Sequence, residues 1–144
     1  MMNADAIRDK VAVTGVGCCK FGENWDQSRE DMIVDAVYEA YADAGIDDPD
    51  KQIDAIFAGA VCPREGSGEV AEALKLFGKP ITMLMDYCQT GTDAFRIGVF
   101  AVACGMYDTV PTIIPSVVRR DRSRATASPK SPILATPSEV IQTL

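Results

Sequence analysis

The amino-acid sequence predicts an α/β fold in which helices cover a parallel or mixed sheet. The main reason is that short apolar segments with strand character alternate with helical patterns over residues 10–110. A second reason is composition, because 144 residues with 47% apolar and 24% charged side chains suit one globular domain with a modest core. Glycines close several of these segments, as they do where strands turn and helices end.

The first strand and the first helix have the clearest boundaries. Residues 10–17 are mostly apolar and end in glycine, which predicts a buried strand. Ser28 predicts the start of a helix that reaches residue 44, with Asp31 as the acid of a capping box and Gly45 as the C-cap. The helix face that we expect to be buried contains Ile33, Val37, Ala40 and Tyr41.

The later elements follow from the alternating apolar pattern of strands and the 3.6-residue apolar pattern of helices. Strands are predicted at residues 52–59, at 81–85 and from 107 onward, and a helix at 69–77. Residues 90–103 are apolar on nearly every side, which predicts a helix buried over most of its surface. The resulting order is strand, helix, strand, helix, strand, helix, strand.

Charge and hydropathy exclude two classes of partner. The formal net charge is −7, so the surface repels phosphate backbones, and we expect no nucleic-acid partner. No apolar stretch approaches the roughly 20 residues of a membrane span, and the N-terminal residues contain no apolar signal region. We therefore expect a cytoplasmic protein without a membrane span.

The residue types available also restrict the chemistry. The sequence has no His, so the chain alone cannot complete a Ser/His or Cys/His catalytic pair. Its five cysteines are odd in number and form no C-x-x-C pair, which argues against a disulfide framework and a structural zinc site. They stand at positions 18, 19, 62, 88 and 104. We expect reduced thiols, no bound metal and no bound cofactor.

The composition changes near residue 110. Residues 1–110 carry 9 basic and 19 acidic side chains, whereas residues 111–144 carry 5 basic and 2 acidic side chains. Five of the eight prolines and no glycine lie in the second part. We expect a domain at residues 10–110 and an aberrant or disordered tail at 111–144, and a linker, a disordered extension and a frameshifted translation all remain open.

A glycine pair after the first strand invites comparison with dinucleotide-binding motifs. Gly15 and Gly17 form G-x-G, but Lys20 stands where the third glycine is required, and Gly59 stands where an acid should end the second strand. We therefore interpret the two glycines as residues that let the chain turn sharply at a strand end.

Cys88 occupies the position in the sequence best suited to a reactive thiol. It follows the apolar strand at 81–85 and a short polar turn, and it directly precedes the helix at 90–103. Free amide groups and the positive end of the helix dipole favour a thiolate at such a place and can also hold an anionic oxygen. The alternative is a small core cysteine at a strand–helix junction, and position alone leaves both interpretations open.

Three segments in order resemble the N-terminal half of thiolases, most closely the lipid-transfer-protein-type thiolases and acetyl-CoA acetyltransferases. They are VAVTGVGCCKFGENWDQSREDMIVDAVYEAYADAGID at residues 11–47, IDAIFAG at 53–59 and DYCQTGTDAFRIGVFAVACGMYD at 86–108. The resemblance implies a thiolase-like half with a mixed, mainly parallel sheet covered by helices. It also implies an acyl-CoA acyltransferase for thiolytic cleavage or Claisen condensation of a 3-oxoacyl-CoA, in which Cys88 takes the acyl group from the thioester.

The chain departs from the thiolase pattern beside Cys88. The family commonly has Asn two residues before the nucleophile and a small residue directly after it, whereas this chain has Asp86 and Gln89. The charge of Asp86 opposes a thiolate, and Gln89 narrows or redirects the acyl pocket. The resemblance also implies a second half with catalytic His residues, which this sequence lacks. We thus expect an incomplete fragment, inactive by itself.

The resemblance implies partners as well. An acyl-CoA is the substrate, a homo-oligomer is expected, and a small zinc-ribbon/OB-fold subunit is a possible companion. Two alternatives to the enzyme remain open: a non-catalytic module that binds lipid or acyl-CoA, and an inactive truncated remnant.

Overall fold

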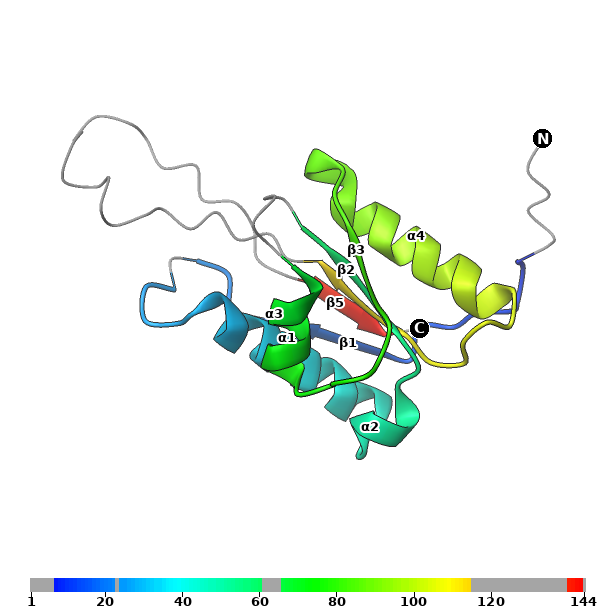
Figure 1. Ribbon diagram of the computed structural model, residues 1–144, viewed down its shortest axis with the longest axis horizontal. Coiled ribbons are helices and arrows are strands. Elements are labelled where there is room, and N and C mark those ends of the chain that lie inside the picture. Colours follow the sequence, from blue (N-terminus) through cyan, green and yellow to red (C-terminus); the bar gives the residue numbers. More distant parts are fainter. Residues whose placement is uncertain (1–6, 23, 61–65, 115–139, 144) are drawn as a thin grey trace.

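A computed structural model describes residues 7–22, 24–60, 66–114 and 140–143. In this part of the chain five short strands form one sheet in the order β1-β5-β4-β2-β3 (Figure 1). They are β1 (Gly15–Cys18), β2 (Ile56–Gly59), β3 (Ile81–Leu84), β4 (Pro111–Ile114) and β5 (Val140–Thr143). β2 pairs in parallel with β3 and β4, whereas β5 is antiparallel to β1 and β4. Four strands therefore run one way and β5 runs the other, which confirms the predicted mixed, mainly parallel sheet.

Helices cover both faces of this sheet, with a separate apolar core on each. α1 (Arg29–Ala44) and α3 (Ser67–Leu74) share one core, which includes Ile56, Ala58 and Ile113 from the strands. α4 (Thr90–Ala103) packs on the other face with Ala55 and Phe57 (Figure 1). Successive residues near and within β2 thus point to opposite cores, as the pleat of a strand requires.

The first and the last predicted helix agree closely with the structure. The Ser28 hydroxyl accepts a hydrogen bond from the Asp31 amide at 3.1 Å, and the Asp31 carboxylate accepts one from the Ser28 amide at 2.8 Å. Gly45 ends α1 at φ 70°, in the left-handed region that favours glycine. The predicted buried face of α1 is confirmed, and α4 spans the predicted residues 90–103.

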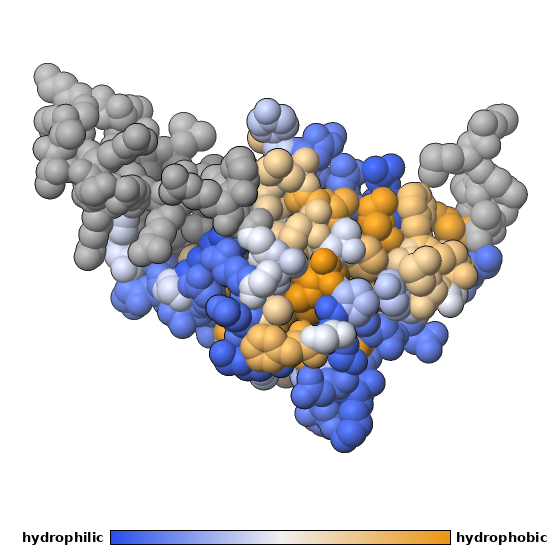
Figure 2. Space-filling view, viewed as in Figure 1, coloured by the Kyte–Doolittle hydropathy of each residue, from blue (hydrophilic) through white to orange (hydrophobic). Residues whose placement is uncertain are grey.

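The burial predicted for α4 is wrong. Only the small residues Thr90, Ala94, Gly98 and Ala101 are buried, while the larger apolar residues remain partly exposed. Figure 2 shows apolar side chains gathered over this helix, on the upper right of the view. The apolar residues surround the helix, but the sheet covers only one side of it.

Several strand and helix boundaries differ from the prediction. β1 begins at Gly15 rather than residue 10. The residues of β1 that pair with β5 are the four from Gly15 to Cys18. A short helix, α2 (Pro49–Gln52), ends on the first residue of the predicted second strand, and β2 begins at Ile56 instead of residue 52. α3 covers 67–74 instead of 69–77, and β4 begins at Pro111 instead of residue 107. Pro111 is the first residue of β4, a strand position that tolerates proline.

The glycines of β1 serve helix packing. A Cβ atom on Gly15 would lie 2.4 Å from the Ala40 carbonyl oxygen, and one on Gly17 would lie 2.0 Å from that of Ala36. Neither glycine has a positive φ. Our interpretation of a sharp turn is therefore wrong, because these glycines allow α1 to lie directly against β1.

The predicted tail lies mostly outside the described residues, which omit 115–139. Pro111–Ile114 and Val140–Thr143 both belong to the sheet, as β4 and β5. The division of the chain near residue 110 stays a prediction. Among the helices of the described ranges, none combines the length and apolar character needed to cross a membrane.

Candidate active site

Cys88 lies in a sharp elbow between β3 and α4. β3 ends at Leu84, a 3₁₀ turn occupies Tyr87–Gln89, and α4 begins at Thr90. The Cys88 side chain is exposed, so the alternative of a buried core cysteine does not apply. The elbow therefore presents a solvent-accessible thiol directly before the first turn of a 14-residue helix.

The backbone of the elbow is strained beside the cysteine. Tyr87 has a φ of 46°, in the left-handed region that non-glycine residues seldom occupy, and its side chain is 84% exposed. Such a conformation costs on the order of 1–3 kcal/mol, so neighbouring contacts have to hold it.

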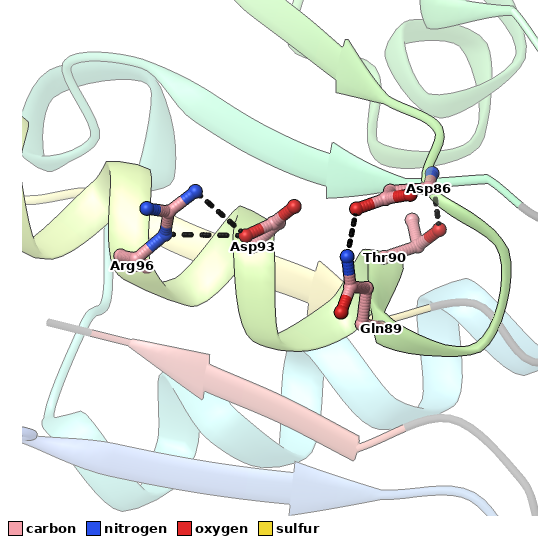
Figure 3. A network of polar contacts seen from close by, with 5 residues as sticks. All are labelled: Asp86, Gln89, Thr90, Asp93 and Arg96. Carbon is pink, nitrogen blue, oxygen red and sulfur yellow. Dashed lines mark hydrogen bonds and ion pairs between the residues drawn. The ribbon is translucent and has the colours of Figure 1, made fainter.

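Thr90 supplies two of these contacts. Its hydroxyl accepts a hydrogen bond from the Asp86 amide at 2.7 Å and donates one to the Tyr87 carbonyl at 2.7 Å. The Gln89 backbone amide also donates to the Asp86 carbonyl at 3.2 Å. Figure 3 shows that the Gln89 side-chain amide donates to the Asp86 carboxylate. The two residues that depart from the thiolase pattern, Asp86 and Gln89, are therefore bonded to each other.

Two glycines let α4 start close to the sheet. A Cβ atom on Gly59, the last residue of β2, would lie 2.6 Å from the Thr90 methyl carbon. A Cβ atom on Gly91 would lie 2.2 Å from Ile114 Cγ2 in β4. Larger residues at either position would push the start of α4 away from the sheet and displace the elbow.

The helix start has the electrostatic character that suits an anionic group. The positive end of the α4 dipole lies at the elbow. The amides of Gln89 and Thr90 already donate to the Asp86 and Tyr87 carbonyls, so the dipole is the main contribution of this helix start. Asp93 in the first turn is bound by Arg96 through its Nε at 3.1 Å and Nη2 at 2.8 Å (Figure 3). The positive charge of Arg96 thus pairs with Asp93, the acidic residue in the first turn of α4.

The other described cysteines have different surroundings. Cys19 is buried, and Cys18 is intermediate, with its thiol donating to the Cys19 carbonyl at 3.3 Å. Cys104 is exposed at the C-terminal end of α4, and its thiol donates to the Ala101 carbonyl at 3.2 Å. Cys62 lies outside the described residues. Within the described ranges, no three His, Cys, Asp or Glu side chains are grouped so as to hold a metal ion.

The sequence predicts that Cys88 lies between a strand and a helix, and the structure agrees, but the sequence does not predict the role of Thr90 or the strain at Tyr87. A threonine at the start of a predicted helix is a signal for side-chain bonding to the preceding backbone, and it could have pointed to Thr90. The left-handed conformation of Tyr87 has no signal in the sequence, because glycine or asparagine usually occupies such positions.

Comparison with known proteins identifies relatives over most of the chain. No protein-family model matches. The acetyl-CoA acetyltransferase of Methanothermobacter thermautotrophicus is 40% identical over 110 residues, which are 72% of this chain and 28% of that protein. The acetyl-CoA acetyltransferase of Methanocaldococcus jannaschii is 36% identical over 110 residues, 72% of this chain and 27% of that protein. The chain thus spans just over a quarter of the length of these relatives.

Solved structures share the fold. The acetyl-CoA acetyltransferase from Syntrophomonas wolfei aligns with a TM-score of 0.58 at 21% identity, covering 83% of this chain and 33% of that chain. The 3-oxoacyl-[acyl-carrier-protein] synthase III from Aquifex aeolicus aligns with a TM-score of 0.65 at 14% identity, covering 91% and 52%. The Ltp2-ChsH2(DUF35) aldolase aligns with a TM-score of 0.60 at 20% identity, covering 80% and 31%. Sequence and fold together therefore show that this chain is similar to acetyl-CoA acetyltransferases over 72% of its length and has a thiolase-like fold.

Proposed function

We propose that this chain provides the nucleophile of a thiolase-type acyl-CoA acyltransferase, with Cys88 as the acyl acceptor. The observation that carries the proposal is the exposed thiol of Cys88 in a constrained elbow before α4. The relation to acetyl-CoA acetyltransferases supports an acyl-CoA as the substrate. The reaction is thiolytic cleavage of a 3-oxoacyl-CoA or the reverse Claisen condensation.

The first step is transfer of the acyl group to sulfur. The Cys88 thiolate attacks the thioester carbonyl, a bond forms between Sγ and the carbonyl carbon, and the carbon–sulfur bond to coenzyme A breaks. The Cys88 amide and the positive end of the α4 dipole stabilise the negative oxygen of the tetrahedral intermediate. Coenzyme A leaves as a thiolate and takes up a proton.

The proton acceptor for Cys88 comes from outside this sequence. The chain contains no His, and it spans just over a quarter of the length of its relatives. We propose that the complete catalytic cycle requires further polypeptide that supplies acid–base groups, and that this chain alone is inactive in turnover. The acyl-transfer step by itself does not need a dedicated base, because a thiolate formed at alkaline pH can attack the thioester.

Incubation of the chain with acetyl-CoA at mildly alkaline pH tests the proposal. Peptide mass spectrometry should find an acetyl group on Cys88, and the Cys88→Ala variant should carry none in that peptide. A chain that binds acetyl-CoA without forming the adduct would instead be a non-catalytic binding module. A chain that does neither would be an inactive remnant, and both results would contradict the proposal.

We also propose that the chain works as a homo-oligomer through the edge of β3. The opposite edge of the sheet is blocked, because the amides of Val16 and Cys18 in β1 donate to the carboxylates of Asp43 at 2.9 Å and Glu39 at 2.7 Å. β3 is the other edge strand of the described sheet, and the chain leaving it exposes Met85 at 61%. An open strand edge with apolar neighbours is suited to strand pairing with a second copy.

Two further expectations belong to this proposal. A small zinc-ribbon/OB-fold subunit is a candidate companion, and a solved neighbour, the Ltp2-ChsH2(DUF35) aldolase, is named for two components. The cytoplasm is the proposed location, because its reducing conditions keep an exposed thiol such as Cys88 available for acyl transfer.

A further inference from the structure

The hydroxyl of Thr90 connects the backbone groups on both sides of the elbow. It accepts from the Asp86 amide at 2.7 Å, as Figure 3 shows, and it donates to the Tyr87 carbonyl at the same distance. One side chain thereby joins the residues that immediately precede Cys88 to the first residue of α4. Because Thr90 is only 3% exposed, water competes poorly for these two bonds.

The methyl group of Thr90 fixes the same side chain to the sheet. It faces Gly59 at the end of β2, at a place where even a Cβ atom on the glycine would come within 2.6 Å. The side chain thus contacts β2 with its methyl group and the elbow with its hydroxyl. Replacing Thr90 by serine would keep the hydroxyl and remove the methyl group. Replacing it by valine would keep the branched shape and remove the hydroxyl.

The strained residue of the elbow depends on this arrangement. Tyr87 holds a φ of 46° and its side chain is exposed, so the packing of its ring contributes little to that conformation. Its carbonyl is bonded to the Thr90 hydroxyl. The Thr90 backbone amide also donates to this carbonyl, so the hydroxyl is one of two donors on it and the side-chain partner of the Asp86 amide. Loss of the hydroxyl removes both of its bonds and weakens the hold on the positive φ of Tyr87, so that the following residue, Cys88, rotates away from the start of α4.

We propose that Thr90 is a positioning residue that holds Cys88 at the start of α4 through its hydroxyl. The consequence for acyl transfer rests on the proposed function, but the positioning itself concerns only the thiol and the elbow. It can therefore be measured with a small electrophile that needs no acyl-CoA site.

The experiment compares two matched pairs of side chains in the full chain. Thr90 and Thr90→Val share a branched shape and differ in the hydroxyl, and Thr90→Ser and Thr90→Ala differ in the same group without the methyl. Iodoacetamide labelling, read by peptide mass spectrometry, gives the rate at Cys88 relative to the rate at Cys104 in the same molecule. Thr92→Val, an exposed position in the same helix turn, is the control.

Removal of the hydroxyl should lower the relative rate at Cys88 by roughly fivefold within each pair, the size expected for loss of a helix-terminus effect. Thr90→Ser should stay close to the parent chain, and Thr92→Val should not change the rate. Equal rates within a pair would overturn the proposal, as would an equal loss in Thr90→Ser. If Thr90→Val fails to fold, the pair of Ser and Ala variants decides alone.

The two proposals fail in different ways. A chain that shows the Thr90 effect on alkylation but forms no acetyl adduct with acetyl-CoA would contradict the proposed function and leave the positioning role standing. Equal rates of adduct formation in Thr90→Ala and Thr90→Ser would contradict the positioning role and leave the proposed function standing.

Discussion

Asp86 and Gln89 flank Cys88 and are bonded to each other through their side chains. The bond engages the Asp86 carboxylate but leaves its negative charge two residues from the thiol. In general, a carboxylate close to a reacting sulfur disfavours negative charge on that sulfur. The elbow therefore combines a helix start that favours the anion with a carboxylate that disfavours it.

Replacement of Asp86 by Asn should make Cys88 more reactive. The variant removes the charge, while its side-chain oxygen can still accept from Gln89, so we expect alkylation by iodoacetamide at neutral pH to rise a few-fold. The gain should shrink at high salt, because ions screen an exposed charge. An unchanged or lower rate at low salt would show that the Asp86 charge does not act on the thiol.

Tyr41, which lies outside the elbow, allows the cost of a buried hydroxyl without a hydrogen-bond partner to be measured. Its side chain is 2% exposed, and its hydroxyl has no hydrogen-bond partner among the described residues. Burial raises the pKa of this hydroxyl above its ordinary value. Tyr41→Phe keeps the ring and removes the unsatisfied group, so the free energy of unfolding should rise by about 1 kcal/mol. A loss of stability in urea denaturation would contradict this.

Helix α1 depends on a capping box that joins Ser28 and Asp31. Replacement of Ser28 by Ala should lower the free energy of unfolding by about 1 kcal/mol, the usual cost of losing an N-cap hydroxyl. The measurement is a urea titration of the full chain. Ser28→Asp, which can still accept from the Asp31 amide, is the control and should lose much less.

The same capping box makes stability depend on pH. Hydrogen bonds from the Ser28 amide and then from its side chain lower the pKa of Asp31 below its ordinary value near 3.8. A lowered pKa in the folded state contributes stability above the unfolded value, and that contribution is lost as the pH falls through the folded value. Asp31→Asn should therefore reduce stability at pH 7 and narrow its gap to the parent chain as the pH falls below about 4. A gap independent of pH would contradict the role of this carboxylate.

Elements with local signals could be predicted from the sequence, and elements with distant partners could not. The boundaries of α1 and α4 follow from residues within or next to each helix, such as Ser28 and Gly45. β5 pairs with β1 and β4, and residues 140–143 by themselves do not indicate these partners. The start of β1 has the same cause, because β5 fixes where its pairing begins.

The residues of the candidate site also divide into those with local sequence signals and those whose partners are distant along the chain. Cys88 could be found because a strand pattern precedes it and a helix pattern follows it. The packing of Thr90 on Gly59 could not be found, because it joins residues 31 positions apart along the chain. The role of Gly15 and Gly17 was misinterpreted for a similar reason, since their contact with α1 becomes visible only in three dimensions.

At the scale of the whole molecule, the two faces of the sheet are covered unequally. Among the helices of the described residues, α1 and α3 lie over one face and α4 lies over the other (Figure 1). Phe95, Val99 and Phe100 of α4 remain partly exposed. Full burial of each would contribute about 1.5–3 kcal/mol, and together these are comparable with the stability of a whole domain.

The chain expressed alone should consequently self-associate, because association removes apolar surface of α4 from water. Size-exclusion chromatography with light scattering measures this directly. Co-expression with the remaining part of an acetyl-CoA acetyltransferase should yield a soluble, monodisperse complex. A monodisperse monomer that melts cooperatively above about 60 °C would contradict the prediction and favour an independent binding module.

The most direct test of the account compares the two exposed cysteines at opposite ends of α4. Cys88 precedes the helix and Cys104 caps its C-terminal end, so solvent access is similar and the direction of the helix dipole differs. With limiting iodoacetamide and folded chain, peptide mass spectrometry should find Cys88 modified first among all five cysteines. In urea that preference should disappear. Faster modification of Cys104, or of Cys18 or Cys62, in the folded chain would remove the physical basis for Cys88 as the nucleophile.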